Sequence, residues 1–124
     1  MSKAKLIWKK KVEKKDFDGA LAYLNLVYSK AKAAKLVRAL RDAAITEHPA
    51  KDLLRASTLA LLDRDEPHVA ADLDRIHKGK SLPPVLLVRG DANLGVPMTV
   101  ADGYHRICAI CYFDENAPVA CCLV

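Results

Sequence analysis

Apolar residues recur at helical spacing along the first third of the chain. From Phe17 to Tyr28 they fall every three or four positions, which predicts a helix over residues 17–29. Asp16 directly precedes this pattern and is the expected N-cap. A second stripe of the same spacing predicts a helix over residues 30–44. Together the two patterns indicate a helical hairpin with a basic outer face.

The middle of the chain alternates short apolar runs with helix boundary signals. Pro49 suits the first turn of a short helix that continues over residues 50–56. Residues 57–62, which read STLALL, are apolar enough to suggest a strand. The run Asp65-Glu66-Pro67 is typical of a helix start and predicts a helix over residues 67–78, ended by Gly79.

The last third of the chain has a pattern that predicts mainly strands. Residues 84–88, reading PVLLV, are almost continuously apolar, as expected for a strand covered on both faces. The further expected elements are a hairpin loop over 90–97, a strand over 98–101, a turn at Asp102-Gly103, a helix over 104–113 and a strand over 119–124. The pattern predicts one α+β domain, a small mixed sheet flanked by helices with the N-terminal helical hairpin packed on it.

Composition supports a globular domain with an unusual N-terminal segment. The chain has 124 residues, of which 52% are hydrophobic, enough for a core and too many for a disordered chain. Seven lysines and one glutamate give residues 1–15 a charge of +6, whereas the remainder carries −1 of the net +5. This segment is expected to be a flexible, solubilising tail. The alternative is that Lys9, Lys10 and Lys11 hold nucleic acid through its phosphates.

Neither a membrane span nor a secretory signal is indicated. No stretch reaches the roughly 18 apolar residues that a spanning helix needs, so we expect a cytoplasmic protein without membrane contact. In that compartment the four cysteines are expected to be thiols rather than disulfides. Cys108, Cys111, Cys121 and Cys122 could in principle bind zinc. Buried core thiols are the preferred interpretation, because adjacent strand residues point to opposite faces.

The segment Val100 to Cys111, reading VADGYHRICAIC, carries the candidate chemistry. A glycine between a strand and a helix lets the backbone turn tightly and approach a ligand. The first helical turn then offers unpaired N–H groups and the positive end of the helix dipole to an anion. His105 and Arg106 lie in that turn, where cations are unfavourable unless an anion offsets them. The segment therefore predicts a phosphate site. The alternative is that Arg106 pairs with Asp102 while His105 lies on the surface.

Residues 57–124 resemble the ParB/sulfiredoxin-like superfamily, also called the ParB-like nuclease fold. The similarity rests on the strand that opens at Pro83-Pro84, the box over Val100 to Arg106 and the closing strand at residues 119–124. Sulfiredoxins carry Gly-Cys-His-Arg in this box, ParB proteins Gly-Glu-Arg-Arg, and ParB-like serine kinases an Asp-Gly-His box. The chain is most similar to uncharacterised bacterial ParB-like proteins with a DGYHR box.

The resemblance implies a nucleotide site with named residues. Phosphate contacts would come from Gly103, Tyr104, His105 and Arg106, and the loop with Gly79, Lys80 and Pro84 would lie near the nucleotide. Tyr104 stands where sulfiredoxins have their cysteine, so sulfinic acid reduction is not expected. The helix-turn-helix and dimerisation parts of a partition protein are not predicted in residues 1–124, so chromosome segregation in the manner of ParB is not expected.

Two functions follow as expectations. The first is nucleotide binding, with Mg²⁺ and ATP, ADP or CTP, extending to phosphoryl transfer or NTP hydrolysis. His105 would then lie near the transferred group, with Asp102 or Glu66 as the assisting acid. Asp63 and Asp65 are further acidic candidates, although such residues commonly cap helices. The second is a non-catalytic nucleic-acid-binding or regulatory module that uses the basic tail.

The remaining polar residues carry weaker signals. His48, His68 and His77 show no metal-ligand spacing and are expected on the surface, so no metal site of the protein's own is predicted. Lys51 and Asp52 could line the pocket, or form an exposed pair.

Overall fold

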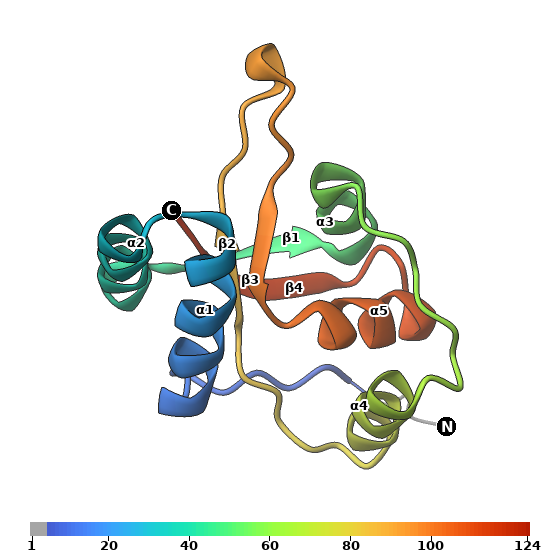
Figure 1. The fold of residues 1–124 in the computed structure, drawn as a ribbon. Coiled ribbons are helices and arrows are strands. Elements are labelled where there is room, and N and C mark those ends of the chain that lie inside the picture. The colour runs from blue at the N-terminus through green and yellow to red at the C-terminus, as the bar shows by residue number, and fades with distance from the viewer. Residues whose placement is uncertain (1–4) are drawn as a thin grey trace.

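The computed structural model describes residues 5–124, which form an α+β fold as predicted (Figure 1). The helices are α1 (Lys14–Val27), α2 (Lys30–Asp42), α3 (Ala50–Ser57), α4 (Pro67–His77), the short 3-10 helix η1 (Ala92–Leu94) and α5 (Tyr104–Phe113). The strands are β1 (Ile45–Pro49), β2 (Val85–Val88), β3 (Thr99–Asp102) and β4 (Pro118–Leu123).

The four strands form one mixed sheet in the order β1-β4-β2-β3. β4 pairs antiparallel with β1 and parallel with β2, and β3 pairs antiparallel with β2. All four residues of β2 are buried, which confirms the strand predicted to be covered on both faces. Because side chains alternate along a strand, Val85 and Leu87 enter one core while Leu86 and Val88 enter the other.

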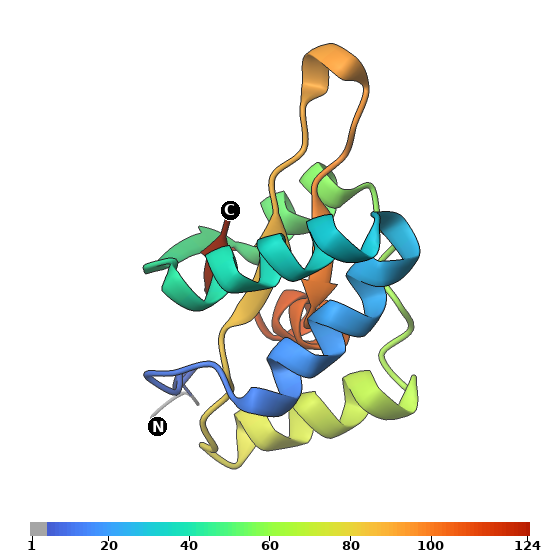
Figure 2. The same cartoon turned by 60° about the vertical axis from the view of Figure 1, so that its left-hand side comes forward.

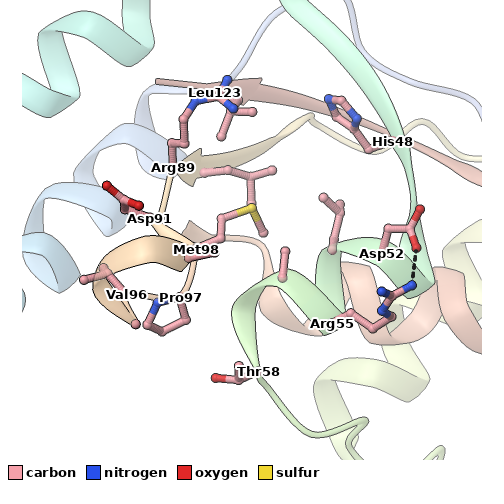
Figure 3. A pocket seen from close by; sticks show the side chains of 16 residues that line it. His48, Asp52, Arg55, Thr58, Arg89, Asp91, Val96, Pro97, Met98 and Leu123 are labelled. Carbon is pink, nitrogen blue, oxygen red and sulfur yellow. Dashed lines mark ion pairs between the residues drawn. The ribbon is translucent and has the colours of Figure 1, made fainter.

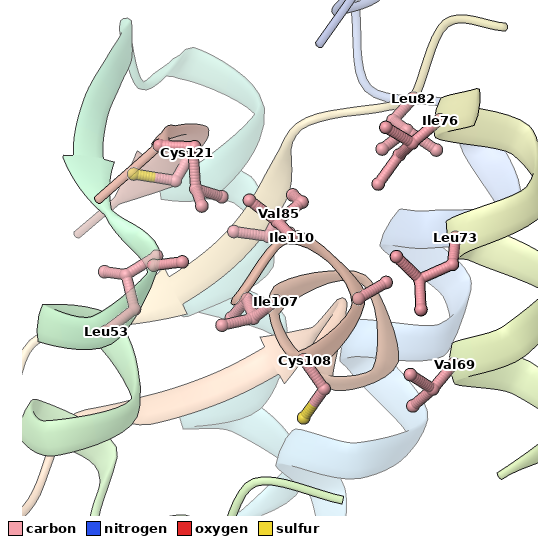
Figure 4. Packing of buried hydrophobic residues seen from close by; sticks show 14 of the residues in the cluster. Leu53, Val69, Leu73, Ile76, Leu82, Val85, Ile107, Cys108, Ile110 and Cys121 are labelled. Atoms are coloured by element: carbon pink, nitrogen blue, oxygen red, sulfur yellow. The ribbon is translucent and has the colours of Figure 1, made fainter. Parts of the chain in front are cut away.

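Helices cover both faces of this sheet (Figures 1 and 2). α1 and α2 pack together on one face, as the predicted hairpin, with Leu24 and Leu40 among the buried residues against β2. α3 and α5 cover the other face and α4 packs on α5, so that Ile107 and Ile110 of α5 share one core with residues of α4 and the sheet (Figure 4). The two cores hold α1, α4 and α5 in fixed positions around the end of β3.

The strand predicted over residues 57–62 is wrong. Ser57 is the last residue of α3, and Thr58 caps the helix in the left-handed conformation with φ 57°. The segment that follows is a loop whose carbonyl groups accept side-chain hydrogen bonds instead of joining the sheet. Tyr104 Oη donates to Ala60 O at 2.5 Å, and Tyr112 Oη donates to Leu62 O at 2.7 Å.

The sheet instead gains β1, which the sequence did not predict. β1 is an edge strand with three exposed residues and two half-buried ones, so no apolar alternation marks it. α3 runs through residues 56 and 57, where the resemblance to the ParB/sulfiredoxin-like superfamily begins. β1, which precedes this point, pairs with β4, which follows it, so one sheet holds residues from both parts of the chain.

The N-terminal segment differs from the expected flexible tail over residues 1–15. Residues 1–4, including Lys3, lie outside the described residues. Trp8 forms a β-bridge with Leu82, with Lys9 N donating to Leu82 O at 2.8 Å. α1 then begins at Lys14 with Glu13 as its N-cap. The N-cap predicted at Asp16 is therefore wrong, because Asp16 lies in the first turn of the helix and is buried.

Candidate functional site

Gly103 joins β3 to α5 in a conformation that suits glycine. Its φ is 110°, and a Cβ at this position would collide with Val85. Gly103 is also the N-cap of α5, and no side chain caps this helix. The sequence prediction of a tight turn followed by a helix start with uncapped N–H groups is thus confirmed.

Arg106 points into the molecule. Its side chain is only 10% exposed, and its guanidinium lies between two carboxylates, 2.6 Å from Asp102 Oδ2 and 3.4 Å from Asp16 Oδ1. Nη1 also donates to Pro83 O at 2.6 Å. We call Asp16, Asp102 and Arg106 the inner cluster. It contains the Arg106–Asp102 pair that the sequence left open as an alternative to phosphate contact.

The inner cluster holds two carboxylates and one guanidinium. Burial raises the pKa of Asp102 to about 7, and the nearby Asp16 carboxyl adds to the rise while Arg106 opposes it. Asp16 and Asp102 share the same guanidinium nitrogen, Nη2 of Arg106, at 3.4 Å and 2.6 Å. The positive charge of Arg106 at the start of α5 is therefore offset from within the protein.

His105 points to the other side of the same turn. Its Nε2 lies 3.9 Å from Glu66 Oε2, and its ring centroid is 4.7 Å from that of His68. Glu66 Oε1 is 2.9 Å from His68 Nδ1. We call Glu66, His68 and His105 the outer cluster. Its side chains are accessible, with 26% exposure for Glu66, 74% for His68 and 44% for His105.

Glu66 is the fixed member of the outer cluster. It is the N-cap of α4, as its sequence context predicts, and its Oε2 accepts a hydrogen bond from Val69 N at 2.9 Å. The hydrogen bond with His68 is the largest cause that lowers the pKa of Glu66, which falls to about 2. Glu66 is therefore a carboxylate at neutral pH.

A cavity of about 210 Å³ lies between α4 and the start of α5. Its lining residues are His68, Ala71, Asp72, Asp102, Gly103, His105 and Arg106. Three of the four predicted phosphate-contact residues thus border one cavity. The fourth, Tyr104, is not among the lining residues, and its hydroxyl is bound to the loop before α4.

The loop predicted to lie near the nucleotide is only partly at this site. Pro84 is close, since its carbonyl lies 3.4 Å from Arg106 Nη1. Gly79 has φ 70° and follows the end of α4, as predicted, so Gly79 and Lys80 lie at the opposite end of this helix from Glu66. Because α4 has 11 residues, its two ends are about 16 Å apart.

Other sequence candidates lie away from the cavity. Lys9 forms an ion pair with Glu13, whereas exposed Lys10 and Lys11 border a groove with Arg41 of α2. All four cysteines are free thiols, as predicted. Among residues 5–124 the outer cluster is the one group with metal-ligand geometry, so no cysteine zinc site forms there. His68 is exposed, as predicted, and the fold places it beside Glu66 and His105, a grouping that the sequence analysis did not predict.

A larger, more apolar cavity of about 610 Å³ lies between α3 and the loop that joins β2 to β3 (Figure 3). Leu53, Val96 and Met98 line it, with Arg55 paired to Asp52 at its rim. Of the two residues expected to border the predicted pocket, Asp52 lines this second cavity and Lys51 lines neither. The lining of this cavity combines apolar side chains with the Asp52–Arg55 pair, whereas the histidine and carboxylate grouping lies at the starts of α4 and α5.

Sequence reasoning missed Asp16 and His68. Asp16 lies 90 positions from Arg106, and no local pattern links the two. His68 follows Glu66 by two residues at a helix start, a spacing that could have suggested a shared site.

Comparison with known proteins assigns no family. Searches against models of protein families, curated proteins and solved structures find no match to this chain. Among residues 5–124, no helix combines the length and apolar character needed to cross a membrane. The ParB/sulfiredoxin-like fold and the cytoplasmic location stay predictions, and the chain is described by its own architecture, an α+β domain with five α-helices and a mixed four-stranded sheet over residues 5–124.

Proposed function

We propose that the cavity at the start of α5 binds a phosphate group of a nucleotide, in a domain of the ParB/sulfiredoxin-like superfamily. The uncapped first turn of α5 carries this proposal. Gly103 brings the backbone to the cavity without a side chain, and the free N–H groups of the turn favour an anion. His105 adds a donor that is accessible from solvent.

The cavity dimensions limit how much of the nucleotide it takes. Its 210 Å³ is less than the roughly 300–1,000 Å³ of typical small-molecule pockets, so it suits phosphate rather than a whole nucleotide. Asp72 and Asp102 line the same cavity and would repel a bare anion. A nucleotide that arrives with Mg²⁺ offsets this repulsion, which favours Mg²⁺ with ATP, ADP or CTP as the ligand.

The proposed chemistry, phosphoryl transfer or NTP hydrolysis, follows from the pairing of His105 with Glu66. The Glu66 carboxylate lies 3.9 Å from His105 Nε2, close enough to orient the imidazole beside a bound phosphate. Asp102, the alternative acid, accepts a hydrogen bond from Arg106. Glu66 is therefore the preferred partner of His105 in this chemistry.

A charge placed in the cavity tests phosphate binding directly. Ala71 is exposed on α4 and lines the cavity. Ala71→Glu should weaken binding of MgATP, MgADP or MgCTP at least about 5-fold, because a carboxylate added a few ångströms from the phosphate costs about 1 kcal/mol or more. Ala71→Gln, which has the same size without the charge, should leave binding nearly unchanged.

Calorimetric titration of the untagged protein is the measurement, with His105→Ala as a second variant that should also weaken binding. Turnover of the bound nucleotide is followed by phosphate release. Absence of nucleotide binding by the wild type, or equal binding by the two Ala71 variants, would refute the proposal.

A second candidate function is nucleic-acid binding by the basic N-terminal segment. It is supported by the exposed Lys10 and Lys11, which border one groove together with Arg41. The double variant Lys10→Ala/Lys11→Ala should then lower affinity for a DNA or RNA duplex and reduce its dependence on salt concentration. Unchanged affinity and salt dependence would exclude this function for the segment.

A further inference from the structure

We infer that Glu66, His68 and His105 form a binding site for a divalent transition-metal ion of the Zn²⁺ type. One ligand atom from each residue lies within 4.8 Å of the other two. The inference does not rest on nucleotide binding, because the three side chains meet without a ligand between them.

The separations match those of a coordination sphere. In a tetrahedral zinc site with Zn–N bonds of about 2.0–2.1 Å, two ligand atoms are about 3.3 Å apart. Here Glu66 Oε1 and His68 Nδ1 are 2.9 Å apart, and Glu66 Oε2 and His105 Nε2 are 3.9 Å apart. The two separations lie on either side of that value.

The ligand types select the metal. Imidazole nitrogen suits Zn²⁺, Cu²⁺, Fe²⁺ and Ni²⁺, whereas Mg²⁺ and Ca²⁺ prefer sites made of oxygen. Two imidazoles with one carboxylate are the protein ligands of several catalytic zinc sites, which leave a fourth position for water. In this chain the 210 Å³ cavity that His68 and His105 line provides space for that fourth ligand.

The scaffold holds the ligands on two packed helices. Glu66 and His68 lie at the start of α4, and His105 lies in the first turn of α5. Val69 and Leu73 of α4 are buried in the same core as Ile107 of α5 (Figure 4), which fixes the two helix starts relative to each other. Sites built on rigid elements hold their ligand geometry better than sites on loops.

The local field favours an anionic fourth ligand. Two helix N-termini point their positive ends toward this region, which opposes a cation and favours an anion. The Glu66 carboxylate offsets part of this effect. Hydroxide or a phosphate oxygen in the fourth position offsets the rest.

Titration with Co²⁺ and Zn²⁺ alone, on the untagged protein in phosphate-free buffer, tests the site. The wild type should bind one Co²⁺ with the visible absorption of a four- or five-coordinate ion, and Zn²⁺ should displace it. His68→Ala and Glu66→Gln should each weaken Zn²⁺ binding at least about 10–100-fold, since even loss of an outer-shell partner costs that much. The amide that Glu66→Gln introduces keeps an oxygen that can accept from Val69 N, so the variant retains the helix cap.

His77→Ala is the matched control, because His77 is an exposed histidine at the far end of the same helix. It should bind metal as the wild type does. Zn²⁺ binding that is equally strong in His68→Ala would overturn the inference, and so would a thiolate-to-cobalt charge-transfer band from the cysteines. Metal binding without any nucleotide binding would leave this site standing and refute the proposed function alone. The two tests are separable, because Ala71→Glu changes none of the three metal ligands.

Discussion

The inner and outer clusters differ in what surrounds them, although both begin at the first turn of α5. Arg106 of the inner cluster is 10% exposed and bound to two carboxylates and a carbonyl. His105 of the outer cluster is 44% exposed and lies beside a cavity. Neighbouring residues on a helix point about 100° apart, so one turn can serve the fold with one side chain and a ligand with the next. The residues of one sequence motif are thus divided between a buried ion cluster and an accessible cluster for which ligand binding is proposed.

Replacement of Arg106 should have the largest effect on stability. Arg106→Met removes the cation and leaves Asp16 and Asp102 buried without it, a loss of about 3–5 kcal/mol in unfolding free energy. Urea denaturation measures it. The triple variant Asp16→Asn/Asp102→Asn/Arg106→Met removes the stranded charges and should recover part of the loss. A loss below about 1 kcal/mol for Arg106→Met would mean that the inner cluster is not structural.

Substitution of Gly103 should have the next largest effect. Gly103→Ala puts a side chain at φ 110° and against Val85, so strain and overpacking together should cost about 2–4 kcal/mol. Gly95→Ala is the matched control, since Gly95 has φ 68° but open space around it. It should cost only about 1 kcal/mol, for the backbone conformation alone. Equal losses in thermal unfolding would contradict the close approach of β2 to the turn.

Ionisation of Asp102 should make the inner cluster sensitive to pH. Its pKa is about 7 in the folded protein against 3.8 for an ordinary aspartate, so between these values the folded state binds more protons than the unfolded state. Stability from this group is therefore present at low pH and is lost as the pH rises toward 7.

The Asp102→Asn variant isolates this effect, because its amide cannot ionise. From about pH 5.5 to about pH 8.5 the wild type should lose about 2 kcal/mol of stability relative to Asp102→Asn, as measured by urea denaturation. The histidines and the facing groups Asp16, Asp72 and Arg106 are common to both proteins, so the difference between the two stability curves reports mainly on position 102. A constant difference over this range would place the proton elsewhere.

The fold was predictable where local patterns carry it. The apolar spacing indicated α1, α2 and α5, and the Asp65-Glu66-Pro67 run marked the start of α4. β1 and the loop after α3 were missed for one reason. β1 is polar but paired with β4, whereas the loop is apolar but satisfied by the two tyrosine hydroxyls. Tertiary partners, not local pattern, decide both segments.

The candidate site was predictable as a location but not as a geometry. Gly103 and His105 fall at the cavity because a strand–glycine–helix pattern fixes the turn locally. The direction of Arg106 could not be predicted, because it depends on Asp16, a residue on α1. The partnership of His68 with His105 likewise depends on how α4 packs on α5.

Replacement of the outer histidines should have the smallest effect on stability, which completes the contrast between the clusters. His68→Ala and His105→Ala should each change the unfolding free energy by less than about 0.5 kcal/mol, because their exposed rings support little of the core. The same variants should weaken Zn²⁺ binding, and His105→Ala should also weaken nucleotide binding. Arg106→Lys is the converse probe, since Lys keeps the charge without the fork that spans two carboxylates, and it should lower stability more than either histidine variant. If His105→Ala proved as destabilising as Arg106→Lys in urea denaturation, the outer cluster would serve the fold as the inner cluster does, and the division of this turn between stability and chemistry would not hold.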